Sequence, residues 1–300
     1  MPLNEIEQHP YLQYFRSFHN ENVDWSKYES IIIGSFPVYQ ITETVYPNHE
    51  ARQVNPNLFM PFFYGSQTNN FWPLLAKTLS SDDPRLAQTG EMRKQNAINI
   101  LENYNILLTD IIFRTNRFQN IPADPYSPFD SSLLNRNAEN EVLIRFSLNT
   151  ELIDWLSLAA NVNSIYFTAQ GVDNKTPGGW FNQLLSSANV NFTTFNQNAS
   201  AVNYQIILNG QQRIFKVFYL PTPSSSRSLA FTDKRRHQMF GNYLASHCPE
   251  LYKALQNRDF KSNPHQRTAL KQHRKSFLKL CWNQFVIHKN VHFNGARNSY

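Results

Sequence analysis

The chain has 300 residues, of which 41% are hydrophobic and only 17% charged, a balance that supports a sizeable core and argues against a mainly disordered protein. The first twenty residues contain no continuous apolar stretch and no apolar run in the chain is long enough to span a bilayer, so we expect a soluble, cytoplasmic protein (nucleoid-associated if bacterial). The two cysteines cannot build a disulfide framework, and we expect no metal or cofactor. The net charge of +6 is concentrated near the C-terminus, where residues 253–300 hold ten Lys or Arg and one acid, Asp259.

The first predicted elements are a buried strand and an amphipathic helix. Residues 30–35 (SIIIGS) form a short apolar run rich in β-branched side chains, which is typical of a buried strand. Residues 68–79 open with helix-capping residue types and place apolar side chains on one helical face. Because Pro73 is tolerated only in a first turn, this helix should begin close to Asn69 or Asn70.

Strands and helices continue to alternate along the rest of the chain. The pattern predicts a helix at 91–104, a strand at 106–113, helices from 130 to about 161, a strand at 164–169, a short helix at 180–187, strands at 202–209 and 214–220, and helices at 231–246 and 264–282. The tetrapeptide Asn209-Gly210-Gln211-Gln212 between the last two strands has the composition of a hairpin turn.

This alternation predicts an α/β fold, a three-layer α/β/α arrangement with a central, mainly parallel sheet. The boundary is expected between residues 248 and 263, giving an α/β domain at 1–250 and a basic, helical C-terminal extension at 251–300. Open parallel sheets bind ligands outside the carboxyl ends of their strands. The functional site is therefore expected where the strands at 30–35, 164–169 and 214–220 end.

Three segments lie at or near these positions. After the last strand comes Leu220–Ser228 (LPTPSSSRS), whose small hydroxyl residues near a helix start suit phosphate, although a Ser/Pro surface loop is the alternative. Upstream are residues 33–37 (IGSFP) and 63–72 (FYGSQTNNFW). Together the three segments resemble the uracil-DNA glycosylase superfamily, closest to its mismatch-uracil and hypoxanthine-type branches.

Those branches carry a GxxP loop, an aromatic–x–His–Pro–x–Asn–x–Phe–Trp segment and a Leu-Pro-x-x-Ser loop, in the order found here. The likeness covers about residues 30–245. It implies a monofunctional enzyme that flips a deaminated or otherwise modified base out of duplex DNA and hydrolyses its N-glycosidic bond, leaving an abasic site. No lyase step is expected, because Lys216 falls inside a strand pattern and no other nucleophilic lysine stands in a motif. We expect a monomer.

The resemblance also suggests catalytic residues, with departures. Mismatch-type relatives place a water-positioning Asn in the first loop, where this chain has Ser35-Phe36. By alignment with the hypoxanthine-type branch the catalytic amide would be Asn69, although Ser66-Gln67 replaces the usual His-Pro and Asn69 could instead cap a helix. Asp110, at the end of a buried strand, is the second candidate catalyst, and the alternative is a cap for the following loop.

The strand ends and the resemblance together give the candidate contacts to DNA. Tyr64 aligns with the position that stacks on the flipped base, and Ser226 or Arg227 with the wedge that fills the vacated stack. The candidate base-binding residues are Ser35, Phe36, Phe63, Tyr64, Thr168 and Thr222, although Phe63 and Tyr64 could equally be core residues. The candidate DNA-binding residues are Ser224, Ser225, Ser226 and Arg227 in the loop and Lys271, Arg274, Lys275 and Lys279 in the basic extension.

The sequence leaves the biological role open. Base-excision repair and antiviral excision of bulky, for example glucosylated, cytosine from phage DNA use the same chemistry. The long polar segment 38–61 would lie beside the base pocket, where it could govern substrate choice. Two other readings are a catalytically silent DNA-binding module, suggested by Phe36, and a nucleotide-processing α/β enzyme, against which the basic extension argues.

Overall fold

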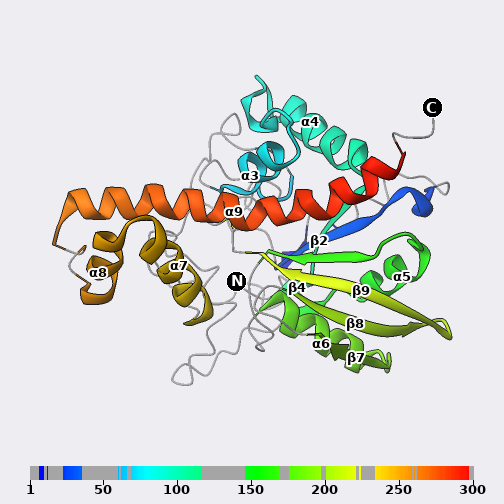
Figure 1. The fold of residues 1–300 in the computed structure, drawn as a ribbon. Coiled ribbons are helices and arrows are strands. Elements are labelled where there is room, and N and C mark those ends of the chain that lie inside the picture. The colour runs from blue at the N-terminus through cyan, green and yellow to red at the C-terminus, as the bar shows by residue number, and fades with distance from the viewer. Residues whose placement is uncertain are drawn as a thin grey trace, which may run out of the picture. The chain divides into compact units, whose positions relative to one another are not determined.

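A computed structural model describes residues 7–9, 12, 23–35, 60, 62–65, 69–115, 146–168, 176–196, 201–220, 223, 234–258, 260 and 262–296. The chain packs as two compact units (Figure 1). The first, here called the sheet unit, comprises residues 1–67 and 84–220, and the second, the helical unit, comprises residues 68–83 and 221–300. Among the described residues, no helix combines the length and apolar character that crossing a membrane requires.

The sheet unit is built on six strands in the order β3-β2-β6-β9-β8-β7, of which Figure 1 labels β2, β9, β8 and β7. Their bounds are β2 Ser30–Gly34, β3 Ile106–Asp110, β6 Ser164–Phe167, β7 Phe192–Phe195, β8 Ala201–Leu208 and β9 Gln211–Tyr219. The first four strands of the sheet order pair in parallel, and β8 and β7 continue the sheet in antiparallel fashion. The predicted α/β class with a mainly parallel sheet is confirmed.

The central strands follow from their composition. All five residues of β2 and all five of β3 are buried, and their consecutive apolar side chains at 31–33 and 106–108 suit parallel strands covered on both faces. The β8–β9 hairpin closes at Asn209-Gly210, where both residues have positive φ, 50° and 79°. A two-residue hairpin turn requires that conformation, and Asn-Gly is its preferred dipeptide.

Helices accompany the sheet and are compatible with the three-layer arrangement. Their bounds are η1 Trp25–Lys27, η3 Pro84–Leu86, α4 Gly90–Asn103, α5 Glu151–Leu158 and α6 Pro177–Ser187. Helix α4 begins where the Thr89 hydroxyl accepts a hydrogen bond from the Met92 amide at 3.2 Å. Helix α6 begins in the same way at Thr176, with Pro177 in its first turn.

Two predicted elements differ from the structure. The strand predicted at 106–113 ends at Asp110, and β4 (Ile112–Thr115) belongs to a second, three-stranded sheet. The helix predicted to continue through 146–148 is wrong there, because those residues form β5 (Phe146–Leu148), which pairs with β4. The third strand of this sheet is β1 (Glu7–Gln8). Such short strands carry no periodicity of their own and depend on partners far away in sequence.

The helical unit holds α3 (Phe71–Thr78), α7 (Lys234–His247), α8 (Pro249–Asn257) and α9 (Pro264–Ala296). Its apolar cluster consists of Phe240, Leu244, Leu251, Leu255, Leu270, Phe277 and Cys281. Helix α3 packs on α9, and the Phe71 ring meets the Trp282 ring edge-on at 5.6 Å. The predicted basic helix at 264–282 is confirmed and extends to Ala296. The division of the chain into domains at residue 250 stays a prediction.

Arg213 of β9 binds the end of α5, and its removal should be costly. Its guanidinium donates to the carbonyls of Leu156, Ala159 (3.1 Å), Ala160 (2.8 Å) and Val162 (2.6 Å), where a helix end leaves carbonyls unsatisfied and favours a cation. Arg213→Met is expected to lower the free energy of unfolding by about 1–3 kcal/mol in urea denaturation. Arg213→Lys should recover little of this loss, since one ammonium cannot donate to all four carbonyls as the planar guanidinium does. Full recovery would contradict the assignment.

Candidate active site at the carboxyl edge of the sheet

The sheet has a topological switch point at β2, where successive connections of the chain lead to opposite sides of the strand. From β2 the chain moves to β3 on one side and then crosses to β6 on the other. Open parallel sheets bind ligands at the carboxyl ends of strands at such a point. The register places Gly34 beside Asp110, and the Thr168 amide donates to the Ile33 carbonyl at 3.1 Å. Three strand ends, at Gly34, Asp110 and Thr168, therefore lie together.

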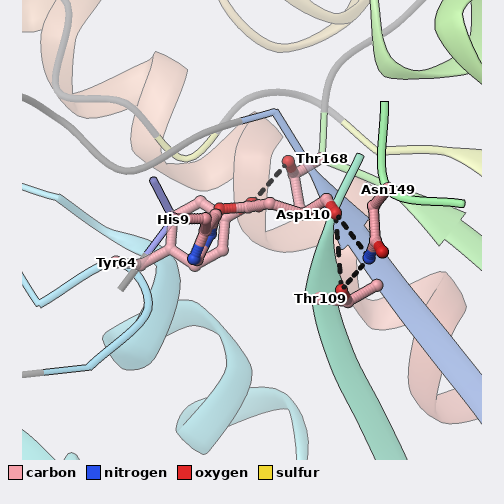
Figure 2. Close-up of polar contacts among 6 residues, drawn as sticks. All are labelled: His9, Tyr64, Thr109, Asp110, Asn149 and Thr168. Atoms are coloured by element: carbon pink, nitrogen blue, oxygen red, sulfur yellow. Dashed lines mark hydrogen bonds and ion pairs between the residues drawn. The ribbon is translucent and has the colours of Figure 1, made fainter. Parts of the chain in front are cut away.

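The carboxylate of Asp110 is buried and bonded to a histidine from the N-terminal segment. Asp110 and His9 are each 3% exposed, and His9 Nε2 lies 2.8 Å from Asp110 Oδ2 (Figure 2). The His9 amide donates to the Phe113 carbonyl at 2.9 Å, and its ring packs against Phe63 with centroids 5.1 Å apart. Sequence reasoning missed His9, because a contact across 101 positions leaves no local signal.

Tyr64 reaches the same place from a strained turn. Its φ of 54° is a left-handed conformation that is costly for an aromatic residue. The turn is held by hydrogen bonds from the Met60 amide to the Gly65 carbonyl (3.2 Å) and from the Gly65 amide to the Phe62 carbonyl (3.1 Å). The Tyr64 hydroxyl lies 2.8 Å from Thr168 Oγ1 (Figure 2). Strain of this kind is typical of functional sites, where it aims a side chain.

Gly34 lets two oxygen atoms converge over the end of β2. A Cβ at this position would overlap both the Tyr64 hydroxyl and Asp110 Oδ1. Burial of the hydroxyl end, and then the nearby Asp110 carboxylate, raise the pKa of Tyr64 well above its ordinary value. The phenol therefore stays protonated at neutral pH and can donate a hydrogen bond.

Asn149 fixes the backbone that carries Asp110. It is 2% exposed, and its Nδ2 donates to Thr109 Oγ1 (3.3 Å) and to the Asp110 carbonyl (3.4 Å) (Figure 2). Among the described residues, Asp110 Oδ1 is buried and has no hydrogen bond of ordinary geometry. The carboxylate is thus held by His9 through one oxygen, while the other oxygen lies beside the Tyr64 hydroxyl. Such an arrangement can accept a proton from a water molecule.

The remaining predicted base contacts divide into two groups. Ser35 follows β2 directly and its carbonyl accepts from the Ile112 amide at 3.1 Å, while Phe63 is 1% exposed and packs between His9 and Phe62. Base contact by Phe63 stays a prediction, although its packing is that of a core side chain. The other predicted residues, Phe36, Thr222, Ser224, Ser225, Ser226 and Arg227, lie outside the described residues.

Asn69 belongs to the helical unit and lies at the start of α3. Its Oδ1 accepts a hydrogen bond from the Phe71 amide at 2.9 Å, so it makes the cap-like contact named above as the alternative to catalysis. The neighbouring Asn70 amide donates to the Pro223 carbonyl at 2.9 Å. Within this unit, the residues that precede α3 are therefore linked to Pro223, which follows the last strand. A catalytic role for Asn69 stays a prediction.

Of the four predicted DNA-binding residues on α9, three are exposed. Lys271, Lys275 and Lys279 face solvent, whereas Arg274 is 8% exposed. Among the described residues, no three His, Cys, Asp or Glu side chains are grouped so that they could hold a metal ion.

Comparison with protein family models, with curated proteins and with solved structures finds no match. The assignment of a function thus depends on the residues at the carboxyl edge of the sheet and on the three sequence segments.

The buried phenol of Tyr64 predicts sensitivity to alkali. Since its pKa in the folded protein lies above the unfolded value of about 10, the unfolded state loses this proton first. Its stabilising contribution is complete below pH ~10 and declines above it, by up to ~1.4 kcal/mol per pH unit until the folded pKa is reached. Above pH ~10, the free energy of unfolding measured with urea should fall with pH less steeply for Tyr64→Phe than for the parent protein. The two slopes should differ by up to ~1.4 kcal/mol per pH unit. Parallel pH profiles would contradict the assigned burial.

Proposed function

We propose that this chain is a monofunctional DNA glycosylase that hydrolyses the N-glycosidic bond of a flipped, non-canonical base and leaves an abasic site. The observation that carries the proposal is the convergence of Asp110, Tyr64 and Thr168 over Gly34, at the carboxyl edge of a parallel sheet. Gly34 and Tyr64 also belong to two of the three segments that resemble the uracil-DNA glycosylase superfamily.

The chemistry needs few groups. Cleavage of the bond builds positive charge on the sugar, and the bonding electron pair leaves with the base. A water molecule adds to the anomeric carbon, and Asp110 accepts its proton through Oδ1. The protonated Tyr64 hydroxyl and Thr168 are hydrogen-bonding groups for the departing base, whose negative charge such donors stabilise. Asn69 is the alternative group for holding the water.

The test is to identify released bases by mass spectrometry after incubating the purified protein with modified DNAs. The panel contains uracil, hypoxanthine and xanthine substrates, together with phage DNA carrying hydroxymethylated or glucosylated cytosine. Alkali-labile abasic sites are measured in parallel, and Asp110→Asn and Asn69→Ala accompany each substrate. Release of one base by the parent protein, strongly slowed in Asp110→Asn, is the expected result, and slowing in Asn69→Ala alone would assign the water-holding role to Asn69.

The released base also decides the biological role. A deaminated base would favour repair, whereas glucosylated cytosine would favour defence against phage. If no DNA in the panel releases a base while duplex binding persists, the proposal fails and a catalytically silent DNA-binding module takes its place.

A further inference from the structure

From Arg267 to Lys279, helix α9 carries a cation at every fourth position. Arg267, Lys271, Lys275 and Lys279 are all exposed, and residues four apart lie on the same side of a helix. We call these four residues the basic stripe. Helix α9, Pro264–Ala296, contains no Asp or Glu, so the stripe has no acidic partner on its own helix.

A second helix of the same unit adds to this charge. Lys77 of α3 is exposed, and its ammonium is the largest cause that lowers the pKa of Lys279, with a smaller contribution from Lys275. Helix α3 (FWPLLAKT) also contains no acidic residue, and it packs on α9 through Phe71 and Trp282. Like charges four residues apart destabilise a helix by about 0.2–0.5 kcal/mol per pair. The fold therefore tolerates an unfavourable concentration of positive charge, which a polyanion would relieve.

Arg274 lies outside the stripe. It is 8% exposed on a side of α9 that also buries Leu270, Phe277 and Leu278, and this burial lowers the pKa of Arg274. Its predicted contact with DNA thus has less support than those of Lys271, Lys275 and Lys279.

We propose that the basic stripe, extended by Lys77, binds the phosphate backbone of duplex DNA. Neighbouring cations of the stripe are about 6 Å apart along the helix axis, and Arg267 and Lys279 about 18 Å. A linear array suits a linear polyanion, on which each cation neutralises a phosphate and releases counterions. A single nucleotide would instead require cations that converge on one point. The choice of duplex DNA rests on the proposed function.

The residues beside the stripe favour nucleic acid over a lipid surface. The adjacent exposed positions on α9 are Thr268, Gln272 and Ser276, which are polar. A membrane-surface helix places large apolar side chains next to its cations, and only Leu280 does so among the described residues of this part of α9. Hydroxyl and amide side chains beside lysines are instead typical of phosphate contacts.

The experiment measures binding of a fluorescent duplex without any modified base, as a function of salt concentration. The triple variant Lys271→Gln/Lys275→Gln/Lys279→Gln should bind roughly tenfold or more weakly at low salt. Its plot of log affinity against log salt should be flatter by about 2.7, which is 0.9 for each of three lost phosphate contacts. The matched control is Arg114→Gln/Lys216→Gln/Lys253→Gln, which removes the same charge from other exposed positions and should keep the parent slope.

Other outcomes would overturn the proposal. Equal slopes for the two triple variants would show a general charge effect rather than a binding surface. Binding to anionic lipid vesicles that only the stripe variant loses, with DNA binding intact, would assign the stripe to a membrane. Because the duplex carries no substrate base, the slope is independent of catalysis. If the stripe variant changes the salt slope but no base is released, the DNA-binding role of the stripe stands and the glycosylase proposal fails. If a base is released and the slope is unchanged, the glycosylase proposal stands and the role of the stripe fails.

Discussion

Asp110→Asn is expected to slow base release by about 10²- to 10⁴-fold while leaving the affinity for duplex DNA unchanged, because the amide cannot accept the proton of the attacking water. The substitution conserves shape, and the amide can still hydrogen-bond to His9. Single-turnover kinetics on the substrate base found in the panel give the rate, and fluorescence anisotropy gives the affinity.

Two further variants separate catalysis from structure. His9→Gln removes the group that holds Asp110 Oδ2 and should lower the rate by a smaller factor, because the carboxylate remains but its orientation is less defined. Asn69→Ala removes the alternative water-holding group. If Asp110→Asn retains the parent rate and Asn69→Ala loses it, Asp110 is a structural residue and the catalytic amide lies at the start of α3.

The central sheet could be predicted because its residues carry local signals. Residues 31–33 of β2 and 106–108 of β3 are consecutive apolar side chains, as is usual in strands covered on both faces. Asn209-Gly210 marks the β8–β9 hairpin through its preference for positive φ. The carboxyl end of β6, and therefore Thr168 as a site candidate, follows from the same signals and from the rule that ligands bind at carboxyl ends, whereas the strand predicted at 106–113 ran past Asp110.

The rest of the site depends on contacts that the sequence does not display. His9 meets Asp110 only because the two-residue strand β1 pairs with β4, and neither the strand nor the pairing has a periodicity. Asn149 holds the end of β3 from a segment predicted to be helical, where β5 forms instead through its pairing with β4. The prediction of a helix was wrong at residues 146–148, because long-range pairing outweighed the local preference of these residues, whereas α5 at Glu151–Leu158 agrees with it.

Gly34→Ala is expected to disrupt the candidate active site directly. The added Cβ would overlap the Tyr64 hydroxyl and Asp110 Oδ1, in a strand that is buried on both sides. Forcing one carbon into a packed interior costs about 1–3 kcal/mol, and here the atoms displaced are those proposed to act on the substrate. Urea denaturation should show the loss of stability, and base release should fall at least as far as in Asp110→Asn.

A double-mutant cycle would show whether the hydroxyl is the obstacle. Tyr64→Phe removes one of the two overlapping oxygen atoms, so Gly34→Ala should cost less in the Tyr64→Phe background than in the parent protein. The matched control is Tyr166→Phe, a buried tyrosine on neighbouring β6 whose hydroxyl is not among the three atoms nearest to a Cβ at Gly34. Strictly additive losses for Gly34→Ala and Tyr64→Phe would mean that the Tyr64 hydroxyl does not lie over Gly34. In that case Asp110 alone would occupy the end of β2, and the proposed hydrogen bond from Tyr64 to the departing base would lose its basis.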